Sequence, residues 1–178
     1  MLALRSYNAA PRTCTPGDHE LGWTSADSEI LYNVPNWGRG YFHVNAKGNV
    51  AVTPERNGSS ATPPIDLYEL IGQIERRGIR APILLRFDGI LRGRVRDLNR
   101  AFDAARKEFS YEAPYRGVYP IKVNQQRHVV EELLEEGRQW GMGLEVGSKP
   151  ELLAAIAVNT GAPSLLICNG YKDANYIE

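Results

Sequence analysis

The fold is decided by the stretch Gly117-Val118-Tyr119-Pro120-Ile121-Lys122-Val123 and by the segments that follow it. This stretch is short, apolar and rich in β-branched and aromatic residues, which is typical of a strand. Similar runs at 143–146 and 164–168 predict two more strands. Apolar residues at helical spacing predict a helix that Gly137 ends and another that begins after Ser148. Strands that alternate with helices in this way are usually parallel, so we predict an α/β fold.

This pattern is the repeating unit of closed (β/α)8 barrels and of open doubly wound sheets. A closed barrel has eight strands, whereas the recognisable units of this kind here amount to about three. We therefore predict either part of a barrel, incomplete in this chain, or a small open sheet.

Two helices and one further strand are predicted before this unit. Asp66 is suited to cap a helix, with Glu69 three residues after it and Gly78 at the end of the helix. The apolar run Ile83-Leu84-Leu85 predicts a short buried strand. From Leu91 to Phe109, apolar residues recur at steps of three and four, which predicts a helix with one face in the core and a charged, solvated face opposite.

The chain divides into three predicted parts. Residues 1–22 are polar, rich in Pro, Thr and Gly and without periodicity, which predicts a flexible leader. Residues 23–64 contain two short strands around a tight turn, from Tyr41 to Val52, and end in a linker from Asn57 to Pro64. Residues 65–178 hold the helices and strands described above and are predicted to be the first portion of a barrel domain.

The composition of the 178 residues, 43% hydrophobic and 24% charged, is typical of a globular protein. Lys plus Arg and Asp plus Glu both number 21, so no excess charge favours a nucleic acid, and a small polar metabolite is the better expectation for a partner. Cys14 and Cys168 form neither a disulfide framework nor a metal-ligand spacing. No apolar run is long enough for a signal peptide or a membrane span, so we expect a cytoplasmic location without membrane association.

Lys122 is the first candidate for a chemical role. It follows an apolar strand, at the edge where parallel-sheet and barrel folds place their sites. Apolar surroundings favour the neutral amine of a lysine, and only the neutral amine attacks an aldehyde to form a Schiff base. The alternative is a side chain that extends from the end of a strand into water, which on position alone is the commoner arrangement.

Four other polar residues stand near predicted strand or helix ends. Glu145 ends the second strand and is expected at the same edge as Lys122; the alternative is a carboxylate that faces water or pairs with an Arg. Asn169 follows the third strand and is a candidate pocket residue, although an Asn before a turn needs no function. Glu151 is interpreted as the capping partner of Ser148, and His128, at the start of a helix, as a surface or capping residue.

The segment from Tyr115 to Glu132 resembles the cofactor-lysine motif of biosynthetic arginine decarboxylases. Its central part reads Tyr119-Pro120-Ile121-Lys122-Val123-Asn124-Gln125-Gln126-Arg127-His128. Relatives on the same barrel share only a shorter pattern, aromatic-x-x-Lys-x-Asn, whereas the long block is specific. The resemblance runs from about Trp23 to the last residue and includes the blocks 82–92, 143–152 and 168–173.

The resemblance implies an amino-acid decarboxylase, a carbon–carbon lyase, that depends on pyridoxal 5'-phosphate (PLP) and is built on a TIM-like barrel of the alanine-racemase type. Lys122 would hold PLP as a Schiff base, and Glu145 matches an acidic residue that lies near PLP in related enzymes. The implied reaction converts L-arginine to agmatine and CO2 for polyamine and spermidine synthesis. The resemblance also implies Mg2+ as a cofactor and a homo-oligomer for the intact protein.

Several features of the family come later in the chain than residue 178. They are the Gly-rich loop that binds phosphate, the acidic groups that select arginine and the C-terminal β-domain. We therefore expect that this chain alone is inactive and does not hold PLP firmly. Ornithine and diaminopimelate are the alternative substrates, and a non-catalytic truncated product is the alternative to an enzyme; the block 125–128 favours arginine.

Overall fold

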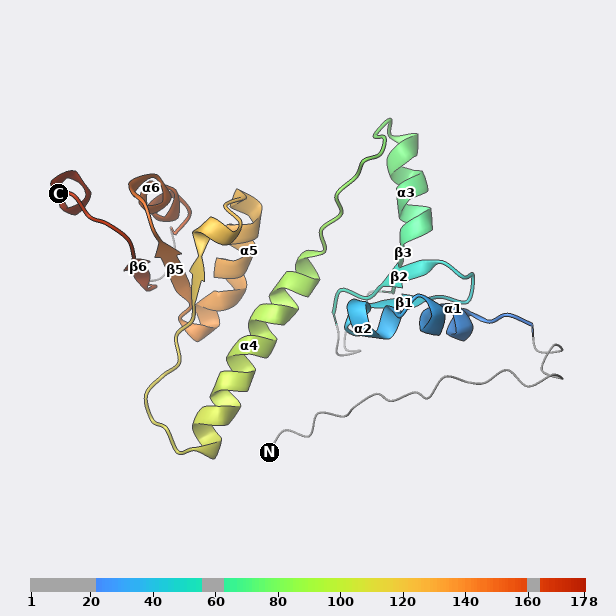
Figure 1. Cartoon of the computed structure of the whole chain (residues 1–178), viewed down its shortest axis with the longest axis horizontal. Helices are drawn as coiled ribbons and strands as arrows, with labels where there is room; N and C mark the ends of the chain where they lie inside the picture. Colours follow the sequence, from blue (N-terminus) through green and yellow to red (C-terminus); the bar gives the residue numbers. More distant parts are fainter. Residues whose placement is uncertain (1–21, 56–62, 160–163) are drawn as a thin grey trace.

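Two small sheets lie on either side of the long helix α4 (Asp88–Glu108) (Figure 1). The structure is a computed structural model and describes residues 22–55, 63–159 and 164–178. One sheet is antiparallel with the strand order β1-β2-β3, and the other is parallel with the order β4-β5-β6. The predicted leader lies outside the described residues except for its last residue, and so does most of the predicted linker from Asn57 to Pro64.

The antiparallel sheet is formed by the N-terminal part of the chain. β1 pairs with β2, so the predicted hairpin is confirmed, and Gly48 occupies its turn with a φ of +81°, where a side chain would be strained. The predicted cap of α3 is also confirmed, because the Glu69 amide donates to the Asp66 carboxylate at 3.1 Å. The elements of this part are α1 (Ser25–Leu31), α2 (Val34–Gly38), β1 (Phe42–Val44), β2 (Val50–Val52), β3 (Ile65–Asp66) and α3 (Leu67–Arg76).

Helices α1 and α2 correct the prediction for residues 23–64, which described a β segment only. At the start of α1 the Thr24 amide donates to the Asp27 carboxylate at 2.9 Å, and the Asp27 amide donates to the Thr24 hydroxyl at 3.3 Å. Asn33 then adopts a left-handed conformation and begins α2. These reciprocal Thr24 and Asp27 bonds form a capping box, a helix-start pattern that can be recognised in the sequence.

The predicted strand at Ile83-Leu84-Leu85 is wrong. These residues belong to an extended segment that runs from α3 to α4 without a strand neighbour among the described residues (Figure 1). Leu84 is 77% exposed, whereas Ile83 and Leu85 are half-buried, so the segment is covered on one side only. An apolar run becomes a strand only where a neighbour satisfies its backbone hydrogen bonds, and local sequence does not reveal that neighbour.

The first half of α4 packs against α5 (Arg127–Gly137). Ion pairs from Arg92 to Glu132 and from Arg96 to Glu136 border this contact, and both carboxylates are largely shielded from water. Apolar contact and flanking ion pairs therefore join the two helices. The buried cluster between them consists of Val95, Val129, Leu133 and Met142.

The second half of α4 corrects the prediction that the stripe from Leu91 to Phe109 is helix core throughout. Leu98, Phe102 and Phe109 are 46%, 43% and 77% exposed. The reason is length, because α4 has 21 residues and α5, which covers it, has only 11. Phe102 stacks on Tyr115, with ring centroids 3.9 Å apart, so the loop that follows α4 covers part of this residue.

The parallel sheet confirms the predicted order of strand, helix, strand, helix and strand. Its register pairs Pro120 with Glu145 and Glu145 with Ile167. Leu144 and Val146 of the central strand are fully buried against α5 and α6 and form the main core. The elements are β4 (Val118–Pro120), the 3-10 turn η2 (Ile121–Val123), α5, the 3-10 turn η3 (Arg138–Trp140), β5 (Gly143–Val146), α6 (Lys149–Val158), β6 (Leu166–Cys168) and α7 (Ala174–Ile177).

Two glycines of α4 allow the N-terminal part of the chain to approach closely. A Cβ added at Gly89 would lie 2.8 Å from the Cβ of Pro54, and one added at Gly93 would lie 3.2 Å from the hydroxyl oxygen of Tyr41. The first distance is shorter than real Cβ contacts, so Pro54 can lie this close to α4 only because residue 89 is a glycine.

Gly89→Ala should therefore destabilise the protein, by about 1–3 kcal/mol, because the added methyl group overlaps Pro54. Gly72→Ala on α3 is the matched control, since its Cβ would meet only Arg76 Nη1 at 3.5 Å, and better helix propensity should stabilise it by about 0.5–1 kcal/mol. Urea unfolding measures both changes. Equal effects of the two substitutions would contradict the close contact.

Glu132→Gln should make the protein less sensitive to acid. The hydrogen bond from Arg92 lowers the pKa of Glu132, so the ion pair stabilises the fold above the ordinary carboxyl pKa and this stabilisation is lost as the pH falls through the folded-state value. The loss should not exceed about 1 kcal/mol between about pH 5 and pH 3, because Arg92 is partly exposed. Urea unfolding at several pH values measures it. Glu131→Gln is the control, because Glu131 pairs with the more exposed Arg127 within α5. Identical acid sensitivity in Glu132→Gln and wild type would contradict the argument.

Candidate active site

The three residues proposed from the sequence, Lys122, Glu145 and Asn169, lie at one edge of the parallel sheet. Lys122 follows Pro120 by two residues, and Pro120 pairs with Glu145. The backbone N–H of Asn169 donates to the Val146 carbonyl at 2.8 Å, so this residue also stands at the carboxyl ends of the strands. Parallel strands gather residues from distant parts of the chain at such an edge.

Glu145 points to the face of the sheet opposite α5 and α6, which carries no helix in the described part of the chain. Its neighbours Leu144 and Val146 face α5 and α6, and successive side chains of a strand point to opposite faces. Ile167, which pairs with Glu145 in the register, is 40% exposed on the same helix-free face. This face is the one that lies inside when a parallel sheet of this kind closes into a barrel.

The sequence predicts a strand that continues through Lys122 to Val123. This prediction is wrong, because Lys122 lies in the turn η2. The strand ends at Pro120, because a proline has no N–H with which to extend the ladder. The side chain of Lys122 is exposed, so the described residues do not supply the apolar surroundings predicted for it.

The turn that carries Lys122 is closed by two flanking residues. The Tyr119 hydroxyl donates to the Asn124 carbonyl at 3.3 Å, and the Asn124 side chain accepts from the Gln126 amide at 3.0 Å. Ile121, the residue before Lys122, is buried at 2% exposure and anchors the turn in the core. The aromatic-x-x-Lys-x-Asn spacing therefore places the lysine at the tip of a braced turn.

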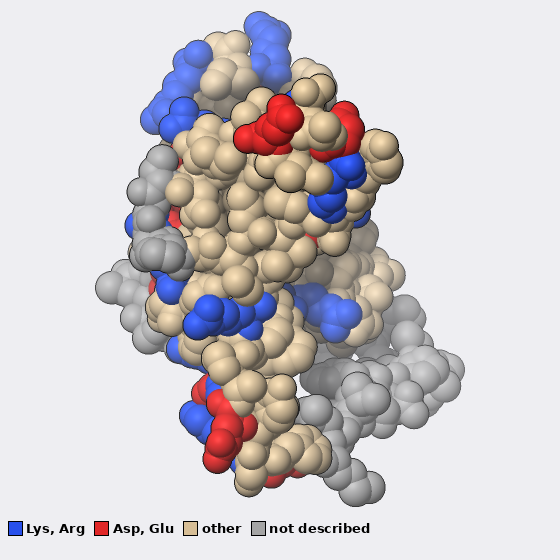
Figure 2. Space-filling view, turned by 90° about the vertical axis from the view of Figure 1, so that its left-hand side faces the viewer, with Lys and Arg blue, Asp and Glu red and all other residues tan. Residues whose placement is uncertain are grey.

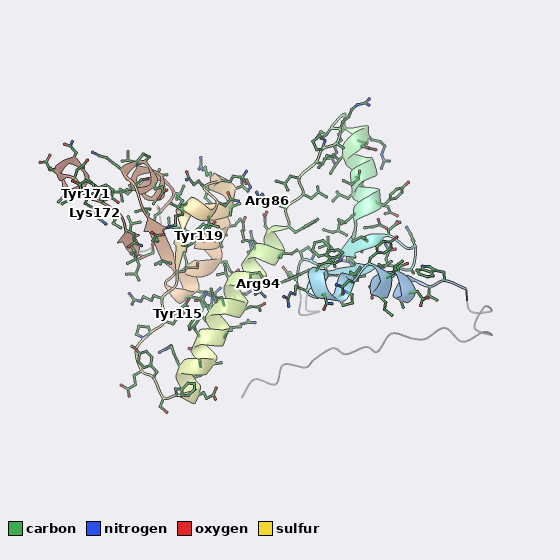
Figure 3. All side chains as sticks on the ribbon, viewed as in Figure 1. Arg86, Arg94, Tyr115, Tyr119, Tyr171 and Lys172 are labelled. Carbon is green, nitrogen blue, oxygen red and sulfur yellow. The ribbon has the colours of Figure 1, made fainter. Side chains whose placement is uncertain are left out.

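The hydroxyl of Tyr119 is a functional group that sequence reasoning missed, although the motif contains it. Burial raises the pKa of Tyr119, and the nearby charge of Arg86 opposes part of this shift. The hydroxyl therefore stays protonated and able to donate at neutral pH. Tyr119 lies on β4, and Arg86 lies on the segment that enters α4 (Figure 3).

Glu145 is only 6% exposed, and the Asn169 side-chain amide donates to its Oε1 at 2.8 Å. The alternative that this carboxylate faces water is therefore wrong. The two residues are 24 positions apart in the chain, and the register of β5 and β6 brings them together.

The comparison with known proteins supports the same interpretation. The domain described as "Pyridoxal-dependent decarboxylase, pyridoxal binding domain" matches residues 95–178. A biosynthetic arginine decarboxylase of Gloeobacter violaceus is 51% identical over 156 residues, which are 88% of this chain and 24% of that protein. One of Prochlorococcus marinus is 49% identical over 163 residues, 92% of this chain and 25% of that protein. The chain is similar over most of its length to biosynthetic arginine decarboxylases.

A solved structure supports the fold of this chain. The biosynthetic arginine decarboxylase SpeA from Campylobacter jejuni matches with a TM-score of 0.70 and 34% identity, over 82% of this chain and 23% of that one. The predicted α/β fold with part of a PLP-binding barrel is thereby confirmed. The chain spans about a quarter of the length of the curated relatives that it matches.

The edge residues fit the cofactor of this family in part. Lys122 supplies an exposed primary amine, the group that condenses with an aldehyde, and Glu145 supplies a shielded carboxylate one strand away. For Mg2+ the fit is absent, because residues 22–55, 63–159 and 164–178 contain no group of three His, Cys, Asp or Glu side chains that could hold a metal ion.

On the face that Figure 2 shows, charged side chains form several separate groups with a broad uncharged area between them.

Of the other two candidates, Glu151 has structural contacts and His128 lies at the surface. The Glu151 amide donates to the Ser148 hydroxyl at 3.4 Å, as a helix cap requires, but the Glu151 carboxylate accepts from the Gly147 amide at 2.7 Å and not from Ser148. His128 is exposed in the first turn of α5. In the described part of the chain, no helix is long and apolar enough to cross a bilayer.

Tyr119→Phe should loosen the Lys122 turn without unfolding the sheet. Loss of the bond to the Asn124 carbonyl should cost about 1 kcal/mol and make amide hydrogen exchange in residues 122–126 about fivefold faster. Tyr115→Phe is the matched control, because the Tyr115 ring keeps its stacking on Phe102. Unchanged exchange in Tyr119→Phe would show that the hydroxyl does not brace the turn.

Proposed function

We propose that the complete protein containing this chain decarboxylates L-arginine to agmatine and CO2, and that Lys122 binds its PLP. One observation carries the proposal. A chain 51% identical to a biosynthetic arginine decarboxylase presents the motif lysine at the carboxyl edge of its parallel strands. Sites of α/β folds are usually built at this edge.

The residues of the chain have distinct parts in the proposed reaction. Lys122 would hold the cofactor, because its primary amine is the kind of group that bonds to an aldehyde. The braced turn η2 limits where this amine can lie, and orientation of the reacting group contributes to the rate. When bound, PLP supplies an electron-accepting ring for the loss of CO2. Glu145 provides a fixed negative charge on the helix-free face, where it orients cationic groups of the cofactor or substrate.

The finer assignments are proposals of the same kind. They include the three parts 1–22, 23–64 and 65–178, a homo-oligomer, a cytoplasmic location, and a role in polyamine synthesis. Mg2+ is proposed only for the complete protein, since the described residues offer it no ligand cluster. The chain alone is proposed to be inactive, because the three parallel strands of its described residues do not close a barrel.

Lys122→Ala in the complete protein should lower agmatine formation by about a thousandfold or more, because the amine that condenses with PLP is lost. Lys107→Ala is the control, since Lys107 lies on α4 in an exposed pair with Asp103. Borohydride reduction of the PLP-loaded wild type, followed by peptide mass spectrometry, should mark Lys122. A mark on another lysine would disprove the assignment.

The substrate is tested separately on the wild-type protein. Release of CO2 should be faster from L-arginine than from ornithine or diaminopimelate by at least about a hundredfold in kcat/KM. A preference for either alternative would keep the cofactor assignment and overturn the substrate.

A further inference from the structure

The bond between Asn169 and Glu145 connects the ends of two neighbouring strands. Glu145 is the buried partner, at 6% exposure, and Asn169 lies on the exposed rim. A carboxylate shielded from water destabilises the fold unless hydrogen-bond donors satisfy it. The side-chain amide of Asn169 supplies such a donor to Glu145 at 2.8 Å.

The backbone around Asn169 is held on both sides. Its backbone N–H donates to the Val146 carbonyl at 2.8 Å. The next residue, Gly170, has a φ of +83°, and a Cβ there would lie 2.7 Å from the Gly147 carbonyl oxygen. The chain therefore turns tightly against the end of β5, and this turn directs the Asn169 side chain back toward Glu145.

We propose that Asn169 is a positioning residue, which holds the Glu145 carboxylate in one orientation toward the cofactor and acts only through it. The inference rests on the proposed function and deepens it, because it replaces an independent pocket role for Asn169 with a role in a pair. A carboxamide suits this position, since a second carboxylate here would repel Glu145 in a shielded place.

The pair can be separated from simple folding effects by five variants of the complete, PLP-loaded protein. They are Asn169→Ala, Asn169→Asp, Glu145→Gln, the double variant of Asn169→Ala with Glu145→Gln, and the exchange Glu145→Gln with Asn169→Asp. The exchange keeps one carboxylate and one carboxamide in contact but reverses donor and acceptor. Asn175→Ala, on exposed α7, is the matched control.

Three quantities are measured: the pH midpoint of the absorbance change of bound PLP without substrate, the thermal unfolding temperature, and kcat with KM. Asn169→Ala should shift the absorbance midpoint in the same direction as Glu145→Gln and lower kcat about tenfold, with KM within about twofold. The double variant should match Glu145→Gln alone, because contacting residues that act as a unit are not additive. The exchange should recover the unfolding temperature relative to Asn169→Asp but keep the altered midpoint.

Two results would overturn the inference. If the kcat effects of Asn169→Ala and Glu145→Gln multiply in the double variant, Asn169 acts on the cofactor or substrate by itself. If Asn169→Ala changes only the unfolding temperature, its role is structural. The absorbance titration needs PLP but no arginine, so a wrong substrate leaves it valid. If borohydride does not mark Lys122, the proposed function fails. The unfolding temperatures of the two single variants and the double variant still test whether Asn169 and Glu145 act as a pair.

Discussion

The close approach of β5 to the start of β6 is the constraint on which the site depends. A Cβ on Gly143 would lie 1.9 Å from the Leu165 carbonyl oxygen, so only glycine permits this distance. All four residues of β5 are buried, and its register with β4 and β6 sets the level of every strand end. The positions of Lys122, Glu145 and Asn169 relative to one another follow from that register and not from local preferences of these residues.

Much of the parallel unit could be predicted because its signals are local. The bounds of β5 and the end of α5 at Gly137 follow from apolar periodicity and from a helix-ending glycine. The errors arise where a distant neighbour decides the outcome. Residues 83–85 have the composition of a strand but lack a strand beside them, and Phe109 continues an apolar stripe past the end of the helix that covers it.

The candidate site shows the same division. That Lys122, Glu145 and Asn169 stand at strand ends could be predicted from strand order, since the carboxyl ends of parallel strands share an edge. The bond between Glu145 and Asn169 could not, because 24 residues separate them and no periodicity links a strand residue to a loop amide. The Tyr119 bond to the Asn124 carbonyl is local, yet it depends on the 3-10 turn that replaces the predicted end of β4.

The two faces of the parallel sheet explain why part of the site is preformed while Lys122 remains exposed. The helix side is closed by α5 and α6, and it anchors Ile121 and Leu144 in one core. Anchoring on that side fixes the backbone from which Lys122 and Glu145 extend. On the helix-free side, Glu145 is shielded, but Ile167 is 40% exposed and Lys122 at its rim is exposed. Geometry at the edge is therefore set by contacts within three strands and two helices, whereas the polarity around the Lys122 amine depends on whatever covers the helix-free face.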